Sequence, residues 1–228
     1  MPTLNVSQDV NKKNGLFLGQ VDMTRLEASC HLSDERRRTL GQFFTPASVA
    51  SLMAGMFGPM PSYVRLLDPG AGIGMLTAAF VAEACRRKDR PGKIDATVFE
   101  IDETLHPHIQ STMERTRKQA STYGISFEWT LRGDNFIEAS SQNINVNLFS
   151  AREDSFTHAI LNPPYKKMGA GCQDRRQVLD SGLVTSNYYA AFVFLASRLL
   201  AKNGELVAIT PRSFCNGSYF FPFREYLH

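Results

Sequence analysis

The stretch Val64–Gly74, VRLLDPGAGIG, combines an apolar run, an acidic residue and three closely spaced glycines. The apolar run predicts a buried strand, and the glycines at positions 70, 72 and 74 allow a sharp turn from that strand into a helix. Such a unit presents backbone N–H groups at the carboxyl end of the strand, where α/β proteins bind ligands. By itself, the turn is also compatible with a plain strand-to-helix connection.

The spacing of the glycines narrows the choice of ligand. The third glycine follows the second by two residues rather than three, unlike the dinucleotide fingerprint, and no Gly-Lys-Ser/Thr closes a phosphate loop. Asp68 enters the turn, and a carboxylate there suits a ligand that carries a cationic ammonium group. S-adenosylmethionine is such a ligand, and we expect it to be the cofactor.

Outward from this unit, short apolar runs alternate with longer helical patterns. Strands are predicted at 64–68, 96–101, 127–131, 158–161 and 205–210, and helices at 75–87, 103–120 and 187–201. The polar segments 139–156 and 166–186 are predicted to be long loops, the second ordered only when DNA or a partner binds. The alternation predicts an α/β fold with a mostly parallel central sheet of about seven strands and helices on both faces.

A further helix is predicted ahead of the first strand. Thr45 and Pro46 have the residue types of an N-cap and a first-turn proline, and apolar residues recur after them at helical spacing. Thr45 is therefore expected to cap this helix.

Composition and charge exclude several classes of protein. Of the 228 residues, 43% are hydrophobic and 21% are charged, which is typical of a globular chain and not of a disordered one. The net charge of +3 permits a polyanionic partner without demanding one. The four cysteines are too far apart for a paired zinc or redox site, the N-terminus lacks a secretion signal, and no apolar run is long enough to span a bilayer. We therefore expect a cytoplasmic protein without a metal site.

Three consecutive predicted strands end near acidic residues, namely Asp68, Glu100 and Asp134. Glu100 would accept hydrogen bonds from both ribose hydroxyls of a nucleoside lying across the sheet. Ile101 would pack on the adenine ring, and Asp134 would accept from the adenine amino group with Phe136 beside it. Each acid alone is compatible with a solvated strand end, but the three together favour a nucleoside-containing ligand.

The fourth predicted strand ends in the turn Asn162-Pro163-Pro164-Tyr165. The carbonyl of Asn162 and the main-chain carbonyl of Pro163 would accept the two hydrogens of an exocyclic aromatic amine, which turns the nitrogen lone pair toward a methyl donor. The prolines would hold these carbonyls in place, and Tyr165 would stack on the flat target ring. An Asn-Pro turn is also an ordinary end to a strand.

The motifs DPGAGIG (68–74), FEID (99–102), GDNF (133–136) and NPPY (162–165) resemble, in this order, motifs I to IV of the S-adenosylmethionine-dependent N6-adenine DNA methyltransferases. GQFFTP (41–46) resembles motif X of that family, and its position ahead of motif I is similar to the gamma class, which includes type I modification subunits and the Eco57I-like, TaqI-like and type IIG enzymes. The resemblance spans residues 40–227. It implies a Rossmann-like methyltransferase fold and methyl transfer from S-adenosylmethionine to N6 of adenine in DNA, within a restriction-modification system.

The resemblance also implies roles for individual residues. Thr45, Pro46, Asp68, Gly70 and Gly72 would surround the methionine part of the cofactor, Glu100 and Ile101 would hold its ribose and adenine, and Asp134 and Phe136 would form the adenine rim. Asn162, Pro163 and Tyr165 would hold the flipped base, and Phe220 matches the aromatic residue that stacks on the target base.

We expect a helical N-terminal extension over residues 1–40 and a methyltransferase catalytic domain over residues 41–228. Family members that act alone carry a target-recognition domain, so the chain is expected to be a truncated piece or to rely on a specificity subunit. Its own DNA affinity is then weak and sequence-blind, supplied by Lys166, Lys167, Arg175 and Arg176. The alternatives are an RNA adenine or protein glutamine N-methyltransferase and a non-catalytic DNA-binding subunit of the same fold.

Overall fold

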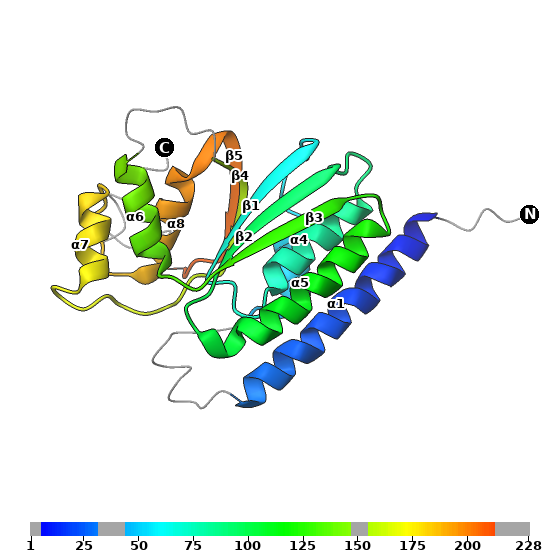
Figure 1. The fold of residues 1–228 in the computed structure, drawn as a ribbon, viewed down its shortest axis with the longest axis horizontal. Helices are drawn as coiled ribbons and strands as arrows, with labels where there is room; N and C mark the ends of the chain where they lie inside the picture. Colours follow the sequence, from blue (N-terminus) through cyan, green and yellow to red (C-terminus); the bar gives the residue numbers. More distant parts are fainter. Residues whose placement is uncertain (1–5, 32–43, 147–154, 213–228) are drawn as a thin grey trace, which may run out of the picture.

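The computed structural model describes residues 6–31, 44–146 and 155–212, with a parallel sheet at its centre. The sheet has five strands in the order β3-β2-β1-β4-β5 (Figure 1). All neighbouring strands run parallel. The strands are β1 (Tyr63–Pro69), β2 (Lys93–Phe99), β3 (Ser126–Arg132), β4 (Phe156–Leu161) and β5 (Leu200–Ala208). The predicted α/β fold is confirmed, and the described residues supply five of the roughly seven strands expected.

Helices cover both faces of the sheet, as predicted (Figure 1). One face carries α1 (Val6–His31), α3 (Ala47–Ala54), α4 (Met75–Arg86) and α5 (His106–Ser121), with the 3-10 helix η1 (Glu103–Leu105) ahead of α5; the other carries α6 (Phe136–Val146), α7 (Gln173–Asp180) and α8 (Tyr188–Arg198). Side chains alternate along each strand, so Leu66 packs in the core under α4 while Leu67 packs in the core under α8.

The strand order reverses between β1 and β4, which pair through Leu67 and Ala159. From β1 the chain proceeds to β2 and β3 on one side, and β4 and β5 lie on the other side. The loops that follow β1 and β4 diverge at such a switch point and leave a crevice at the carboxyl edge of the sheet. The glycine turn after β1 and the Asn-Pro turn after β4 therefore lie on either side of this crevice.

Helix α1 belongs to the same apolar core as α4 and α5. Phe17 and Val21 of α1 are buried in that core. The amide of Asn14 donates to the carbonyl of Ala82 at 2.7 Å and accepts from Gln119 at 2.7 Å. The predicted domain boundary at residue 40 lies outside the described residues. Within the described residues, none of the helices, α1 included, combines the length and the apolar composition needed to cross a membrane.

Two segments predicted to be loops contain helices. Helix α6 occupies residues 136–146, and Asn135 caps it by accepting the backbone N–H of Ile137 at 2.9 Å. Helix α7 lies within the second predicted loop and carries Arg175 and Arg176. Its single buried residue is Val178, so its sequence lacks the apolar repeat by which a helix is recognised.

The start of the second predicted loop is hydrogen-bonded to the start of α8, and its ordering on binding of DNA or a partner stays a prediction. The backbone N–H of Tyr188 donates to the carbonyl of Lys166 at 3.1 Å, and that of Met168 donates to the carbonyl of Ser186 at 2.7 Å. These bonds tie the segment that follows the Asn-Pro turn to the start of α8.

The predictions for two helix ends are also wrong. Helix α8 ends at Arg198 and not at residue 201, because the chain has already entered β5 at Leu200. Helix α3 has Pro46, not Thr45, at its N-cap, with no side-chain cap from Pro46 itself. A carboxylate oxygen of Asp22 in α1 accepts the backbone N–H of Ala47 at 3.2 Å, so the cap comes from a neighbouring helix.

Candidate functional site

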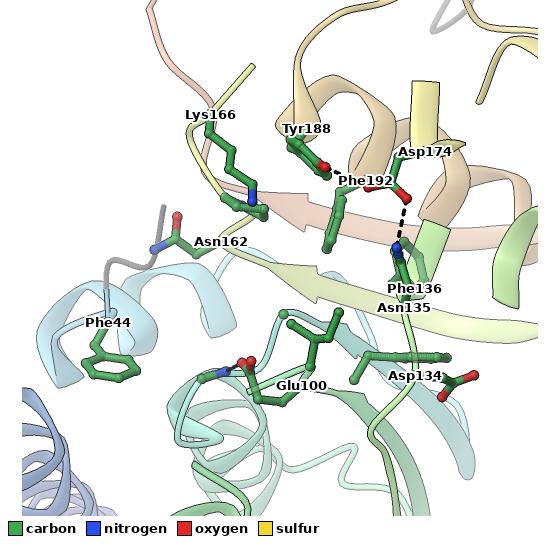
Figure 2. Close-up of a pocket in the computed structure, with 15 residues that line it drawn as sticks. Phe44, Glu100, Asp134, Asn135, Phe136, Asn162, Lys166, Asp174, Tyr188 and Phe192 are labelled. Atoms are coloured by element: carbon green, nitrogen blue, oxygen red, sulfur yellow. Dashed lines mark hydrogen bonds between the residues drawn. The ribbon is translucent and has the colours of Figure 1, made fainter. Parts of the chain in front are cut away.

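A cavity opens at the carboxyl edge of the sheet, and most of its lining comes from the segments that follow β1, β2, β3 and β4 (Figure 2). Its polar lining includes acidic and amide side chains from three of these segments, and its apolar lining includes several phenylalanine rings. The lining residues are Phe44, Gly70, Gly72, Phe99, Glu100, Ile101, Asp134, Asn135, Phe136, Asn162, Pro164, Lys166, Asp174, Tyr188 and Phe192.

The glycine turn after β1 presents backbone to this cavity. Gly70 and Gly72 adopt φ values of +75° and +59°, a left-handed conformation that side chains other than glycine rarely tolerate. The N–H groups of Gly70 and Ala71 both donate to the carbonyl of Phe99 at 2.9 Å, which fixes the turn to the end of β2. A Cβ atom on Gly72 would lie 3.0 Å from the ring of Phe44. The turn thus supplies a wall without side chains.

Glu100 forms a rigid acceptor in the cavity wall. Its side chain is only 4% exposed, and its two carboxylate oxygens accept the backbone N–H groups of Gly72 and Asp102, each at 2.9 Å. Burial raises the pKa of Glu100, and the two N–H donors partly oppose that rise. A carboxylate held in this way faces a ligand without having to reorganise.

Asp68 does not line the cavity, contrary to the prediction that it faces the ligand. It is fully buried beneath the glycine turn, where one carboxylate oxygen accepts the N–H of Thr77 at 3.2 Å and its hydroxyl at 2.7 Å. The other oxygen has no hydrogen-bond partner among the described residues. Burial raises the pKa of Asp68 to about 7. The side chain is directed at the first turn of α4, so it supports the glycine turn from behind.

The residues expected to hold the adenine of the cofactor lie at one end of the cavity. Phe136 is buried, with its ring centroid 5.2 Å from that of Phe99 and 5.0 Å from that of Phe192. Ile101 is 57% exposed at the rim. Asp134 also lies at the rim, and its hydrogen bonds to Arg132 hold the pKa of Asp134 below its ordinary value.

Asn162 lies across the cavity from Glu100 (Figure 2), and Pro164 of the same turn also lines the cavity. The amide nitrogen of Asn162 donates to the hydroxyl of Thr45 at 3.1 Å, and its amide oxygen accepts the hydroxyl of Tyr165 at 2.9 Å. Tyr165 is not among the lining residues, and burial raises its pKa. Pro163 is buried within the turn.

Three other predicted site residues are not among the described residues that line the main cavity. Thr45 lines a smaller pocket next to the main cavity, which it shares with Asn162, Gly70 and Gly72. Pro46 is exposed. Phe220 lies outside the described residues.

A cluster at the mouth of the cavity was missed by the sequence analysis. One carboxylate oxygen of Asp174 accepts from the amide of Asn135 at 2.8 Å, and the other accepts the hydroxyl of Tyr188 at 2.6 Å. The ammonium group of Lys166 lies 4.8 Å from the centroid of the Tyr188 ring. Burial and the bond to Asp174 raise the pKa of Tyr188. Local sequence carried no signal for this cluster, because Asp174 is 39 residues from Asn135.

Known proteins resemble this chain over most of its length. The type II methyltransferase M.BsuBI of Bacillus subtilis is 39% identical over 214 residues, which are 92% of this chain and 41% of that protein. The tRNA1(Val) (adenine(37)-N6)-methyltransferase of Shewanella sediminis is 28% identical over 166 residues, which are 73% of this chain and 59% of that protein. The chain therefore spans about two-fifths of the length of M.BsuBI.

The fold agrees with these likenesses. A solved structure described as a class I S-adenosylmethionine-dependent methyltransferase from Listeria monocytogenes superposes with a TM-score of 0.65 at 15% identity, over 94% of this chain and 59% of that one. The parallel sheet with helices on both faces is thus an S-adenosylmethionine-dependent methyltransferase fold. Residues 20–228 match the Eco57I restriction-modification methylase model, and the chain belongs to that family.

Proposed function

We propose that this chain transfers a methyl group from S-adenosylmethionine to N6 of adenine in DNA, as part of a restriction-modification system. The observation that carries the proposal is the shared cavity, in which Asn162 lies with Gly70 and Glu100. The Asn-Pro turn, which suits an aromatic amine, therefore borders the same cavity as the Glu100 and glycine-turn wall, which suits a nucleoside cofactor. Membership of the Eco57I family and the likeness to M.BsuBI support DNA as the substrate.

The lining of the cavity fits S-adenosylmethionine, which supplies an electrophilic methyl group on a sulfonium centre. The buried carboxylate of Glu100 would accept from the ribose hydroxyls, and the side-chain-free turn at Gly70 and Gly72 leaves room for the methionine part. Phe136 and Ile101 would contact the adenine ring. Asp134, kept ionised by Arg132, would accept from the adenine amino group.

The Asn162 turn would prepare the target amine for attack. The nitrogen lone pair of an exocyclic amine is conjugated with the aromatic ring, which makes the amine a poor nucleophile. Acceptance of its two hydrogens by Oδ1 of Asn162 and the main-chain carbonyl of Pro163 would favour the geometry in which the lone pair points at the methyl donor. Pro163 and Pro164 would restrain the two carbonyls. The new N–C bond would replace the S–C bond of the sulfonium, and the methylated nitrogen would then release its extra proton to water. The nitrogen needs no general base before attack, because it becomes acidic only once methylated.

DNA would enter with the target adenine turned out of the duplex, because a stacked amine cannot reach the donor. Tyr165 would then stack on the flipped base, as would Phe220. Reading of the target sequence would fall to a recognition domain or a specificity subunit, in keeping with the greater length of M.BsuBI. Adenine in RNA is a second candidate substrate, favoured by the likeness to the tRNA methyltransferase of Shewanella sediminis.

Single-turnover transfer of a tritiated methyl group tests the substrate. Unmethylated duplex DNA, transfer RNA and a release-factor protein would be compared at equal concentration, and nuclease digestion would identify the methylated base. We expect N6-methyladenine in DNA. Transfer confined to RNA or to glutamine would contradict the DNA assignment, and binding of the cofactor without any transfer would support a non-catalytic subunit.

Two variants test the roles of the residues. Asn162→Ala should abolish transfer while the Kd for the cofactor, measured by titration calorimetry, stays nearly unchanged, because Asn162 would contact the base. Glu100→Gln keeps the size of the side chain but removes its charge, and it should weaken cofactor binding by roughly 1.5 to 3 kcal/mol. Equal loss of binding and transfer in Asn162→Ala would show that its role is misassigned.

A further inference from the structure

A hydrogen bond between residues 117 positions apart joins the segment before α3 to the Asn-Pro turn. The hydroxyl oxygen of Thr45 accepts from Nδ2 of Asn162 at 3.1 Å. Thr45 is buried, at 7% exposure, and it lines the small pocket that borders the main cavity. In Figure 2 the amide nitrogen of Asn162 points toward the segment that carries Phe44, and the amide oxygen points away from it.

The orientation of this amide decides what Asn162 presents to an amine. A half-turn about the bond to the amide carbon exchanges oxygen and nitrogen at almost no steric cost, because the two ends have nearly the same shape. With Nδ2 turned toward the target, two hydrogen-bond donors would face each other. The hydroxyl of Thr45 can donate as well as accept, so what it contributes is the position of the amide group, and with it the distance from Oδ1 to the target amine.

We propose that Thr45 is a positioning residue for methyl transfer, which restrains the Asn162 side chain through Nδ2 so that Oδ1 stays within reach of the target amine. This inference rests on the function proposed above. It differs from the role that the family resemblance implies for Thr45, which is contact with the methionine part of the cofactor. Tyr165 completes the arrangement, since its hydroxyl donates to Oδ1 and an amide oxygen can accept two hydrogen bonds.

The surroundings of Thr45 leave its hydroxyl for this task. Helix α3 takes its cap from Asp22, which accepts the N–H of Ala47 at 3.2 Å and is itself held by Arg25 at 2.7 Å. Pro46 restricts the backbone next to Thr45, with a φ of −62°. The threonine hydroxyl is thus neither used as a helix cap nor carried on a loosely held backbone.

Thr45→Val tests the proposal, because valine matches threonine in shape but has no hydroxyl. At saturating cofactor and DNA, we expect the single-turnover rate to fall roughly 10- to 100-fold. The Kd values for S-adenosylmethionine, by calorimetry, and for DNA, by fluorescence anisotropy, should stay within about twofold of the wild type, as expected for a group that only positions another. Thr45→Ser is the matched control, since it keeps the hydroxyl and should restore the rate to within about threefold.

Other outcomes would overturn the proposal. Weaker cofactor binding with an unchanged saturated rate would mean that Thr45 serves the cofactor. A loss of rate that serine does not restore would mean that the methyl group of Thr45, and not its hydroxyl, matters. An unchanged rate in Thr45→Val would mean that the hydrogen bond has no role.

A second measurement keeps the test separate from the proposed function. The side-chain amide signal of Asn162, identified in 15N-asparagine-labelled protein by its loss in Asn162→Ala, reports the contact directly. It should shift in Thr45→Val and return toward its original position in Thr45→Ser. If the wild type fails to methylate DNA, the proposed function is wrong. The amide signal of Asn162 then still tests the hydrogen bond between Thr45 and Asn162. An Asn162 signal that does not shift in Thr45→Val would overturn the inference.

Discussion

At the scale of single residues, the most unusual group is the buried carboxyl of Asp68. One of its oxygens has no hydrogen-bond partner among the described residues, and burial raises its pKa to about 7. An ionised carboxylate in such a place costs folding free energy, because burial removes it from water. The buried carboxyl of Asp68 therefore lowers the free energy of unfolding at neutral pH. Ionisable groups that destabilise the fold in this way are typical of functional sites.

Asp68→Asn should relieve this cost at neutral pH. The unfolded chain releases the Asp68 proton near pH 4, but the folded state keeps it until about pH 7. The folded state therefore binds more protons across this window, and the stability of the wild type falls as the pH rises through it. We expect the variant to gain roughly 4 kcal/mol at pH 8 relative to pH 4, measured by urea unfolding, because the two pKa values differ by about three units of 1.36 kcal/mol each.

Asp134→Asn is the matched control, because the pH dependence of stability that Asp134 contributes has the opposite sign to that of Asp68. Arg132 lowers the pKa of Asp134, so this carboxylate stabilises the fold above its unfolded pKa and loses that effect as the pH falls through its folded pKa. Asp134 is about half exposed, so its contribution is small. Parallel stability curves for Asp68→Asn and the wild type would contradict the raised pKa.

At the scale of elements, the junction between the glycine turn and α4 depends on Gly74. This residue is the N-cap of α4 and has a φ of +84°. A Cβ atom there would clash with the methyl group of Met113 in α5 and would lie 3.5 Å from Thr112. The absence of a side chain at Gly74 thus allows α5 to approach the N-terminus of α4 closely.

Gly74→Ala should therefore cost more stability than the backbone conformation alone accounts for. Gly124 offers the control, since its φ is +75° and no described heavy atom lies within 4 Å of a Cβ built there. Gly124→Ala should lose about 1 to 2 kcal/mol from the left-handed conformation. Gly74→Ala should lose more than this, because the buried side chain of Met113 must also move. Equal shifts in the urea midpoints of the two variants would refute the steric explanation.

At the scale of the whole molecule, α1 is part of the core on its face of the sheet. Phe17 is 6% exposed within the core under α4 and α5, whereas its neighbour Leu16 is 61% exposed. The polar contacts of Asn14 with Ala82 and Gln119 join the same helices. The N-terminal helix and the sheet should accordingly unfold in one transition.

The pair Phe17→Ala and Leu16→Ala tests this cooperativity. Phe17→Ala should lose roughly 3 kcal/mol or more, because it leaves a cavity in the core, and circular dichroism and tryptophan fluorescence should still report one coincident transition. Leu16→Ala should change stability by less than about 0.5 kcal/mol. A neutral Phe17→Ala, or a separate early transition, would show that α1 is a loosely attached extension.

The sequence by itself determined the strands and the motif positions. Apolar runs and the glycine turn predicted a strand at each of the five described positions, although β5 begins at Leu200 and not at residue 205. Residues that follow parallel strands share one edge of the sheet, so the meeting of Glu100, Asp134 and Asn162 in one cavity could be predicted without coordinates. These features depend on local patterns and on the direction of the strands.

Only the tertiary structure decided where the side chains at that edge point and what holds them. Asp68 turns inward to Thr77, and Thr45 bonds to Asn162 instead of capping α3. Helix α7 depends on packing around Val178 and on contacts of Asp174, not on an apolar repeat. Contacts of this kind join residues far apart in the sequence, and their free energy is gained only once the sheet has brought those residues together. The local sequence around each residue therefore does not predict these long-range contacts.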